Sequence, residues 1–324
     1  MPMEQEQAEL LARVAHLYFE RGDDQSAIAR RLRVSRSSVS RLLTQARKSG
    51  IVEIRIHYPL NSNTELEKLY CDKFGLKHAL ILKTDSRNAA ETRELVARQA
   101  ARYLENQIVP NMTIAISRGR TLHQVVEQFT PDTRRNVTVV QLVGTLQTNH
   151  LEPDDANLAS ALAQKIGGEY YNLTAPLFVE NIATRRALLQ EPSILQVLNL
   201  ARQAHLALVG IGSLDPQSSA IVRQKLLASH QLETLRQGHA VGEICSQYFN
   251  LQGEIVSTEL SERTIALELS ALKEMQVVAV ASGAHKARAI LGALRGGYVS
   301  VIITDEQTAN LVLEQEHPRA RRKK

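Results

Sequence analysis

The sequence lacks several features that would define a special class of protein. It has no tryptophan, only 4% aromatic residues, and two cysteines, Cys71 and Cys245, far apart in the chain. This cysteine usage excludes a disulfide framework and a cysteine-based zinc module, and it fits a reducing compartment. No apolar run approaches the roughly 18–20 residues that a membrane span needs. The opening MPMEQEQAELLARV has early acids and no apolar core, which argues against a secretory signal, so we expect a cytoplasmic protein with no membrane partner.

The remaining composition is that of an ordinary globular protein. The chain has 324 residues, of which 44% are hydrophobic and 23% charged, and this length favours two domains. Positive charge gathers at both ends: residues 25–52 hold seven basic residues and no acid, and five of the last six residues are basic. Such ends predict a polyanion as partner, and the alternative is a solvated basic surface. We expect no metal and no cofactor.

The hydrophobic pattern divides the chain into four segments. Residues 1–58 predict a small helical domain with helices over 4–21, 25–32 and 35–48, followed by a strand over 51–58. Residues 59–75 predict a linker, formed by the turn-rich PLNSN and a helix over 64–74. Residues 76–316 predict a larger domain, and residues 317–324 a disordered basic tail.

The larger domain alternates apolar runs with helical segments. The predicted strands are residues 78–82, 112–117, 137–143, 170–174, 205–211, 276–281 and 299–304, and the predicted helices are residues 89–107, 121–129, 156–166, 182–189, 221–229, 286–294 and 306–313. Runs such as QVVAVA and VSVIIT are nearly all apolar, as expected for strands buried on both faces. This alternation predicts an α/β domain with a mainly parallel sheet.

The segment QSAIARRLRVSRSSVSRLLT has the pattern of a helix-turn-helix. Ser35 is a suitable N-cap for the second helix, whose first residues would enter the major groove of DNA. Arg33 stands where glycine is common, and a left-handed conformation there costs about 1 kcal/mol. The alternative is a plain helical hairpin with a solvated basic face.

The side chains that this motif would offer to DNA are hydroxyls and guanidiniums. Short hydroxyls allow a close approach to the bases, while arginine reaches a guanine edge or a phosphate. The predicted DNA contacts are Gln25, Arg33, Ser35, Arg36, Ser37, Ser38, Ser40 and Arg41.

Blocks of sequence along nearly the whole chain occur in an order typical of one family. After VAHLYFERGDDQSAIARRLRVSRSSVSRLLTQARKSGIVEIRI come ELEKLYCDKFGLKHALIL, ISRGRTL, VVQLVGTL, DDANLASALAQKIGGEYYNLTAPLFVEN, ALVGIGSL, GHAVGEICSQYFNLQGEIV and VAVASGAHKARAILGALRGGYVSVIITDEQTA. In these blocks the chain resembles the SorC/DeoR-type sugar-binding transcriptional regulators. Several blocks in one order are more specific than a lone helix-turn-helix.

The resemblance implies both a fold and a function. The fold would be an α+β two-domain chain, whose C-terminal α/β domain is similar to ribose-5-phosphate isomerase and glucosamine-6-phosphate deaminase. The function would be a homo-oligomeric repressor or activator, a dimer or tetramer, that binds operator DNA and responds to a sugar or sugar phosphate. The alternative is an enzyme of the isomerase or deaminase class that carries a nucleic-acid-binding appendage; we expect the regulator and no catalytic residues.

The resemblance points to effector contacts in loops after strand ends, where ligands sit in open α/β sheets. Ser117, Gly119, Arg120 and Thr121 follow one apolar run, and free amides at a helix start suit a phosphate. Gly144 and Thr145 follow the next run, although the family's polar residue is replaced by Val143.

Three further positions complete the predicted effector site. A carboxylate at Glu243 can accept two sugar hydroxyls, and the ammonium of Lys286 can pair with a phosphate. Asn157, at a helix start, is a hydroxyl contact or a structural cap.

Overall fold

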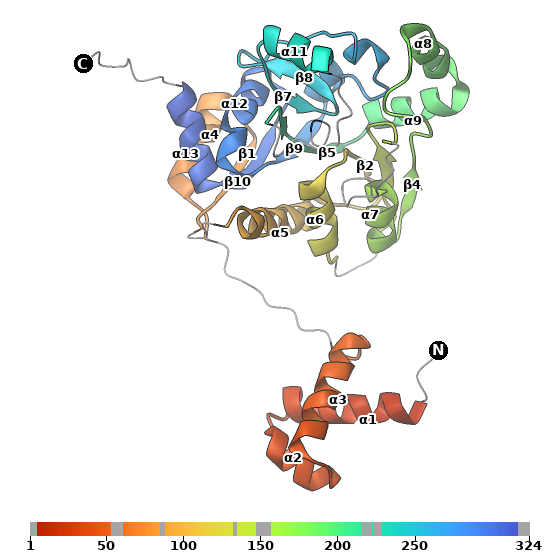
Figure 1. Ribbon diagram of the computed structural model, residues 1–324, viewed down its shortest axis with the longest axis vertical. Coiled ribbons are helices and arrows are strands. Elements are labelled where there is room, and N and C mark those ends of the chain that lie inside the picture. Colours follow the sequence, from red (N-terminus) through yellow and green to blue (C-terminus); the bar gives the residue numbers. More distant parts are fainter. Residues whose placement is uncertain are drawn as a thin grey trace, which may run out of the picture. The chain divides into compact units, whose positions relative to one another are not determined.

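The computed structural model describes residues 5–52, 61–84, 88–131, 135–146, 157–215, 222 and 229–316. The chain divides into two compact units, Met1–Pro59 and Leu60–Lys324 (Figure 1). The predicted strand over residues 51–58, the tail at 317–324 and the predicted helix at 221–229 lie wholly or mostly outside the described residues.

The first unit contains helices that pack around two small apolar clusters. In chain order they are α1 (Gln5–Ala15), the π-helical turn η1 (His16–Glu20), α2 (Gln25–Leu32) and α3 (Arg36–Lys48). The larger cluster consists of Val14, Leu17, Ile28, Ala29, Val39 and Leu43. The small side chain of Ala29, 6% exposed, lets α2 pack closely against its neighbours.

Side-chain caps fix the boundaries of α2 and α3. Asp24 Oδ1 accepts from the Ala27 amide at 2.7 Å, and Ser35 Oγ accepts from the Ser38 amide at 3.1 Å. Between the helices, Arg33 adopts the left-handed conformation with φ of 56°. The predicted bounds of these helices and the cap at Ser35 are therefore confirmed.

The second unit is built on a parallel sheet of seven strands. Their spatial order is β1-β10-β9-β5-β2-β3-β4, and every pairing among them is parallel. The strands are β1 (His78–Leu82), β2 (Thr113–Ile116), β3 (Thr138–Gln141), β4 (Glu169–Tyr171), β5 (Leu206–Gly210), β9 (Gln276–Val280) and β10 (Val301–Asp305). The predicted α/β domain with a mainly parallel sheet is confirmed, and the burial of its strands on both faces explains their apolar sequences.

Helices cover both faces of this sheet (Figure 1). One face packs against α5 (Ala89–Gln107), α6 (Arg120–Gln128) and α7 (Leu158–Ile166). The other packs against α4 (Thr64–Phe74), α9 (Pro192–Arg202), α12 (Ala287–Arg295) and α13 (Glu306–Glu316). Of these helices, α9 was not predicted from the sequence. The remaining α-helices with described bounds are α8 (Ile182–Gln190) and α11 (Ser229–Gln237).

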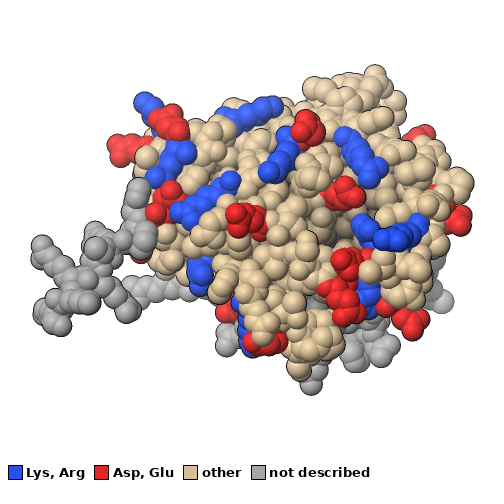
Figure 2. All heavy atoms as spheres, turned by 90° about the horizontal axis from the view of Figure 1, so that it is seen from above, with Lys and Arg blue, Asp and Glu red and all other residues tan. Residues whose placement is uncertain are grey.

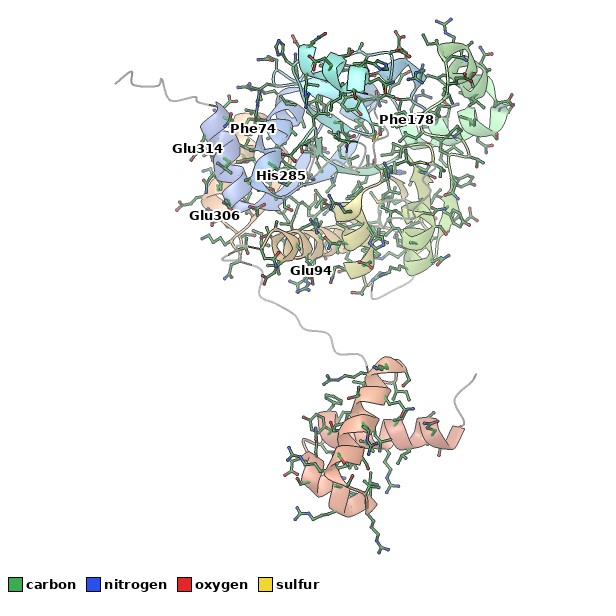
Figure 3. All side chains as sticks on the ribbon, in the orientation of Figure 1. Phe74, Glu94, Phe178, His285, Glu306 and Glu314 are labelled. Carbon is green, nitrogen blue, oxygen red and sulfur yellow. The ribbon has the colours of Figure 1, made fainter. Side chains whose placement is uncertain are left out.

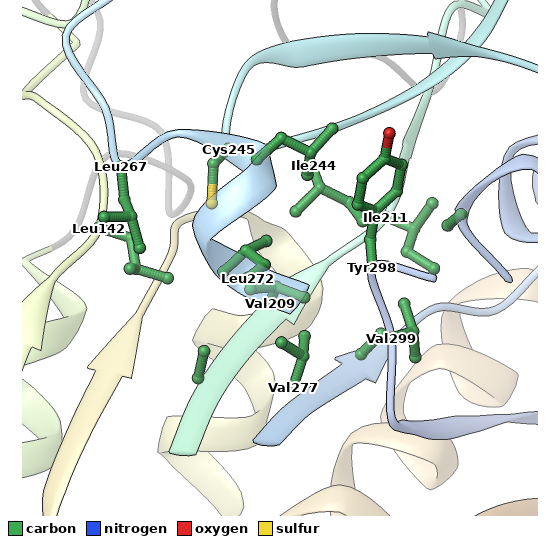
Figure 4. Close-up of a cluster of buried hydrophobic side chains, with 14 of the residues drawn as sticks. Leu142, Val209, Ile211, Ile244, Cys245, Leu267, Leu272, Val277, Tyr298 and Val299 are labelled. Carbon is green, nitrogen blue, oxygen red and sulfur yellow. The ribbon is translucent and has the colours of Figure 1, made fainter. Parts of the chain in front are cut away.

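A second, antiparallel sheet lies beside the parallel one and was not predicted. It consists of β6 (Gly212–Ser213), β7 (Ala240–Ile244) and β8 (Gln247–Asn250). A two-residue turn joins β7 to β8, with φ of 53° at Cys245 and 59° at Ser246, as in a type I′ turn. Figure 4 shows Cys245 among the buried side chains of this region, beside Leu142 and Leu267.

Helix α4, predicted as a linker helix, is part of the second unit's core. Tyr70 is fully buried and donates its hydroxyl to the Ala309 carbonyl of α13 at 2.8 Å. Leu66 is also buried in the cluster that covers this face of the sheet. Burial raises the pKa of Tyr70 far above its ordinary value, so the phenol remains a hydrogen-bond donor.

The Ser35 cap leads to a first testable prediction. Ser35→Ala is expected to destabilise the start of α3 by about 0.5–2 kcal/mol, because the Ser38 amide loses its side-chain acceptor and keeps only the Ser35 carbonyl, at 3.0 Å. Amide exchange at Ser38 in the full-length chain should therefore become faster. Ser40→Ala is the matched control, since Ser40 is exposed and lies one turn further along the same helix. Equal exchange at Ser38 in the two variants would contradict the assigned cap.

Candidate functional site

The order of the parallel strands places a reversal of chain direction across the sheet between β2 and β5. From β2 the chain proceeds to β3 and β4 on one side, whereas from β5 it proceeds to β9 and β10 on the other. In open α/β sheets, such a reversal opens a crevice outside the carboxyl ends of the strands, where ligands bind. Ser117 follows β2 directly and Gly210 ends β5, so both lie at this point.

Glu243 projects from β7 into a space left by a glycine of the neighbouring strand. Its Oε2 accepts from the Ser246 amide at 2.8 Å. A Cβ at Gly212 would overlap the Glu243 carboxylate, so glycine lets this side chain keep its present position. Burial raises the pKa of Glu243, although the Ser246 amide and the charges of Arg118 and Lys286 oppose this shift.

The turn after β7 also contacts the end of β2. The Cys245 thiol lies 3.6 Å from Ser117 Oγ, and both residues are buried. Burial raises the pKa of Cys245 to about 12, so the thiol stays protonated and can donate to the serine. The two-residue turn therefore contacts two predicted effector residues, Ser117 through its thiol and Glu243 through the Ser246 amide.

Cations from three separate segments of the chain act on Glu243 and on His285. The charges of Arg118 and Lys286 act on Glu243, and those of Lys286, Arg120 and Arg93 act on His285. Burial and then these cations lower the pKa of His285, while Asp215 raises it. His285, labelled in Figure 3, follows β9 in the loop before α12. Positive charge from the β2–α6 loop and the β9–α12 loop thus acts on Glu243, and charge from α5 acts on His285, next to Lys286 in the chain.

The backbone between β2 and α6 suits an anion at this position. Gly119, with φ of 125°, is the N-cap residue of α6 and offers no side-chain cap to the first amides of the helix. A side chain there would be strained although nothing would obstruct it, so the conformation alone requires glycine. Thr121 is buried in the first turn and Arg120 is partly exposed.

Three predicted effector residues have structural contacts. Gly144 packs against the backbone of Ala175 and Pro176, 2.8 Å from where its Cβ would be. Thr145 donates its amide to Ala175 and accepts from the Leu177 amide. The Asn157 side chain caps α7 by accepting from the Ser160 amide at 3.0 Å. Effector contact by Gly144, Thr145 and Asn157 stays a prediction. The alternative role of Asn157, as a helix cap, is supported by its hydrogen bond with the Ser160 amide.

Sequence reasoning missed three charged residues near the site. Arg118 lies in the motif SRGRT, between the predicted effector residues Ser117 and Gly119, so the sequence alone could have identified it. Arg93 comes from α5, and Asp215 follows β6; neither lies near the other site residues in the sequence. Their approach depends on the fold, and no local pattern indicates it.

In the first unit, α3 presents one polar face. Arg36, Ser37, Ser40 and Arg41 are exposed, whereas Val39 and Leu43 are buried on the opposite side. Ser35 Oγ lies 2.8 Å from the hydroxyls of both Ser37 and Ser38.

Two further predicted DNA contacts flank this face. Arg33 is exposed in the turn, and Gln25 is half-buried at the start of α2. The helix thus has a face of hydroxyls and guanidiniums, with Ser35 and Ser38 engaged in the cap.

The surface shows no continuous patch of one charge on the face drawn in Figure 2, where acidic and basic side chains alternate. Within the described parts of the chain, no helix combines the length and the apolar character that crossing a membrane requires.

Comparison with known proteins gives consistent matches. Residues 58–314 match the family described as "Putative sugar-binding domain". The sorbitol operon regulator of Klebsiella pneumoniae is 30% identical over 94% of this chain and 98% of its own length, and the deoxyribonucleoside regulator of Bacillus subtilis is 29% identical over 96% and 99%. The crystal structure of the full-length sorbitol operon regulator from Klebsiella pneumoniae superimposes with a TM-score of 0.69 at 28% identity, covering 95% of this chain and all of that one.

The half-buried Glu243 carboxyl group leads to a prediction about pH. Because the pKa of Glu243 is raised in the folded state, stability is lost as the pH rises from the unfolded pKa through the higher folded one. Glu243→Gln removes this loss, and its amide oxygen can still accept from Ser246. We expect the variant's Tm to exceed that of the wild type near neutral pH and to approach it in acid.

Thermal unfolding across this pH range tests the prediction. Glu314→Gln, an exposed position on α13, serves as control. A Tm difference for Glu243→Gln that does not change with pH would show that ionisation of Glu243 is not its source.

Proposed function

This chain belongs to the SorC/DeoR-type family of sugar-binding transcriptional regulators, as its sequence blocks indicated, and we propose that it is an effector-responsive regulator of a carbohydrate operon. Its first unit binds operator DNA and its second unit binds a sugar or sugar phosphate. Effector binding changes the affinity for the operator, by a coupling that is typically about 1–3 kcal/mol.

The convergence of cations beside Glu243 is the observation that carries the effector assignment. Lys286 and Arg118 influence Glu243, and Arg120 and Lys286 influence His285, at the reversal point of the sheet. A phosphate would pair with these cations and with the first amides of α6. The carboxyl group of Glu243 would then bind hydroxyls of the sugar; protonated it can donate as well as accept.

We further propose the folds of both units. A short α2, a left-handed turn at Arg33 and a capped α3 with an exposed polar face support a helix-turn-helix in the first unit. In the second unit, a doubly covered parallel sheet with anion-ready loops supports kinship with ribose-5-phosphate isomerase and glucosamine-6-phosphate deaminase. The protein acts in the cytoplasm. It acts as a homo-oligomer, because we expect a palindromic operator and a two-fold symmetric regulator matches its two half-sites.

The enzyme alternative is less well supported. Relatives that match over nearly their full length are named as regulators, and an isomerase or deaminase has no need of the first unit. A carboxyl group with a raised pKa is nevertheless what a general acid requires. Measurable isomerisation or deamination of sugar phosphates would restore this alternative.

DNA recognition by α3 yields a testable prediction. Replacing Arg36 or Arg41 by alanine should cost about 1–3 kcal/mol in operator binding if that arginine contacts a guanine. The operator is first selected from random duplexes with the wild-type chain, and affinities are measured by fluorescence anisotropy at fixed salt. The double variant Arg13→Ala/Arg21→Ala removes the same charge from exposed positions outside α3 and is the control. Wild-type affinity in Arg36→Ala/Arg41→Ala would exclude α3 as the reading helix.

The effector site yields another prediction. A thermal-shift screen of sugars and sugar phosphates identifies a ligand, because binding to the folded state raises the apparent stability. Calorimetry with Lys286→Ala should then show at least about tenfold weaker binding of a phosphorylated ligand, with operator affinity retained. Lys68→Ala, on the exposed side of α4, is the matched control. Loss in Glu243→Ala alone would indicate an unphosphorylated sugar, and unchanged binding in both site variants would reject this site.

A further inference from the structure

The first turn of α13 holds the loop that carries Lys286. The Gly283 amide donates to Thr308 Oγ1 at 2.8 Å and to Asp305 Oδ2 at 3.2 Å. Thr308 in turn donates its hydroxyl to Asp305 Oδ2 at 2.6 Å and its amide to Oδ1 at 2.9 Å. Asp305 is 2% exposed and Thr308 is fully buried. Any movement of the Gly283 backbone must therefore stretch or break buried hydrogen bonds, which is costly.

The same helical turn also holds the beginning of α4. Glu306, adjacent to Asp305, accepts from Asn63 Nδ2 at 2.5 Å. Asn63 is the N-cap of α4, since its Oδ1 accepts from the Leu66 amide at 3.1 Å. The backbone amide of Asn63 donates to the Ile81 carbonyl of β1 at 2.9 Å. Asn63 is thus fixed between α13 and the edge strand β1.

These contacts join two places that the regulator's function requires to communicate. Gly283 lies three residues before Lys286, and Asn63 lies four residues after Pro59, where the first unit ends. We propose that the first turn of α13, residues 305–308, is the coupling element that connects the effector loop to the segment leading to the DNA-binding unit. This inference rests on the proposed function, because it concerns the regulation of that effector site.

The two sites are coupled because the same helical turn binds both the Gly283 loop and the Asn63 cap of α4. An anion that draws Lys286 toward Arg118 and Arg120 pulls on the Gly283 backbone, whose hydrogen-bond partners belong to this turn. A shift of the turn acts on Glu306 and so on the cap of α4. Coupling must be reciprocal, so loosening the α4 cap must also loosen the Gly283 loop.

A ligand-free experiment on the full-length chain tests this reciprocity by hydrogen exchange. Glu306→Ala removes the contact with Asn63, and we expect faster exchange at the distant Gly283 amide. Thr308→Val removes an acceptor of Gly283, and we expect faster exchange at the distant Leu66 amide. Each change should be about 2–30-fold. Figure 3 labels Glu306 at the start of α13 and Glu314 near its end, and Glu314→Ala is the matched control.

The outcomes separate coupling from simple destabilisation. Thr308→Ser restores the hydroxyl and should return Leu66 to the wild-type rate. If each variant affects only the amide nearest to it, or if Glu314→Ala has the same distant effect, the coupling element is excluded. General destabilisation would accelerate exchange throughout the sheet, including the Val278 amide in the central strand β9, and would also overturn the inference.

Adding inorganic phosphate separates this inference from the proposed function. In the wild type, phosphate should slow exchange at both Gly283 and Leu66, whereas in Glu306→Ala it should slow only Gly283. Slowing of both amides in Glu306→Ala would reject the route through Glu306. An absence of slowing at Gly283 in the wild type would count against the anion site, while the ligand-free comparison would still decide the coupling.

Discussion

Parallel strands cannot be joined by tight turns, and this constraint organises the second unit. Every connection must cross a face of the sheet, so helices cover both faces and the strands end at one common edge. The loops that follow β2, β5, β9 and β10 meet there, although they are separated by up to about two hundred residues of chain. Arg118 and Lys286, from two such distant segments, can therefore both act on Glu243 without any local sequence motif that joins them.

Two buried polar clusters hold these loops in place. At one, the turn of Cys245 and Ser246 adopts left-handed conformations that cost roughly 1 kcal/mol each in residues other than glycine. The turn in return supplies an amide to Glu243 and a thiol to Ser117. At the other, Asp305 and Thr308 satisfy each other and the Gly283 amide. Strained backbone at Cys245 and Ser246 and buried polar side chains at Asp305 and Thr308 thus occur together at the predicted effector site.

Sequence patterns identified the elements whose signals are local. The apolar runs gave the parallel strands, and the cap at Ser35 gave the start of α3. The hairpin of β7 and β8 escaped because its turn is Cys-Ser, whereas a type I′ turn is usually signalled by Asn-Gly or Asp-Gly. Arg93 and Asp305 escaped for another reason: their roles depend on neighbours brought by the fold. Asn157 illustrates an ambiguity that sequence leaves open, because capping and ligand contact need the same side chain.

The pairing of Gly212 with Glu243 has a consequence for how related regulators can diverge. Because a Cβ at position 212 would overlap the Glu243 side chain, a larger residue at 212 requires that side chain to move or to become shorter, whereas Gly212 leaves residue 243 free to change. A lineage that acquires a larger residue at 212 must therefore also shorten or redirect residue 243, whereas residue 243 can change while 212 stays glycine. If Glu243 contacts the effector as proposed, a change at 212 would accompany a change of ligand among descendants of this sequence.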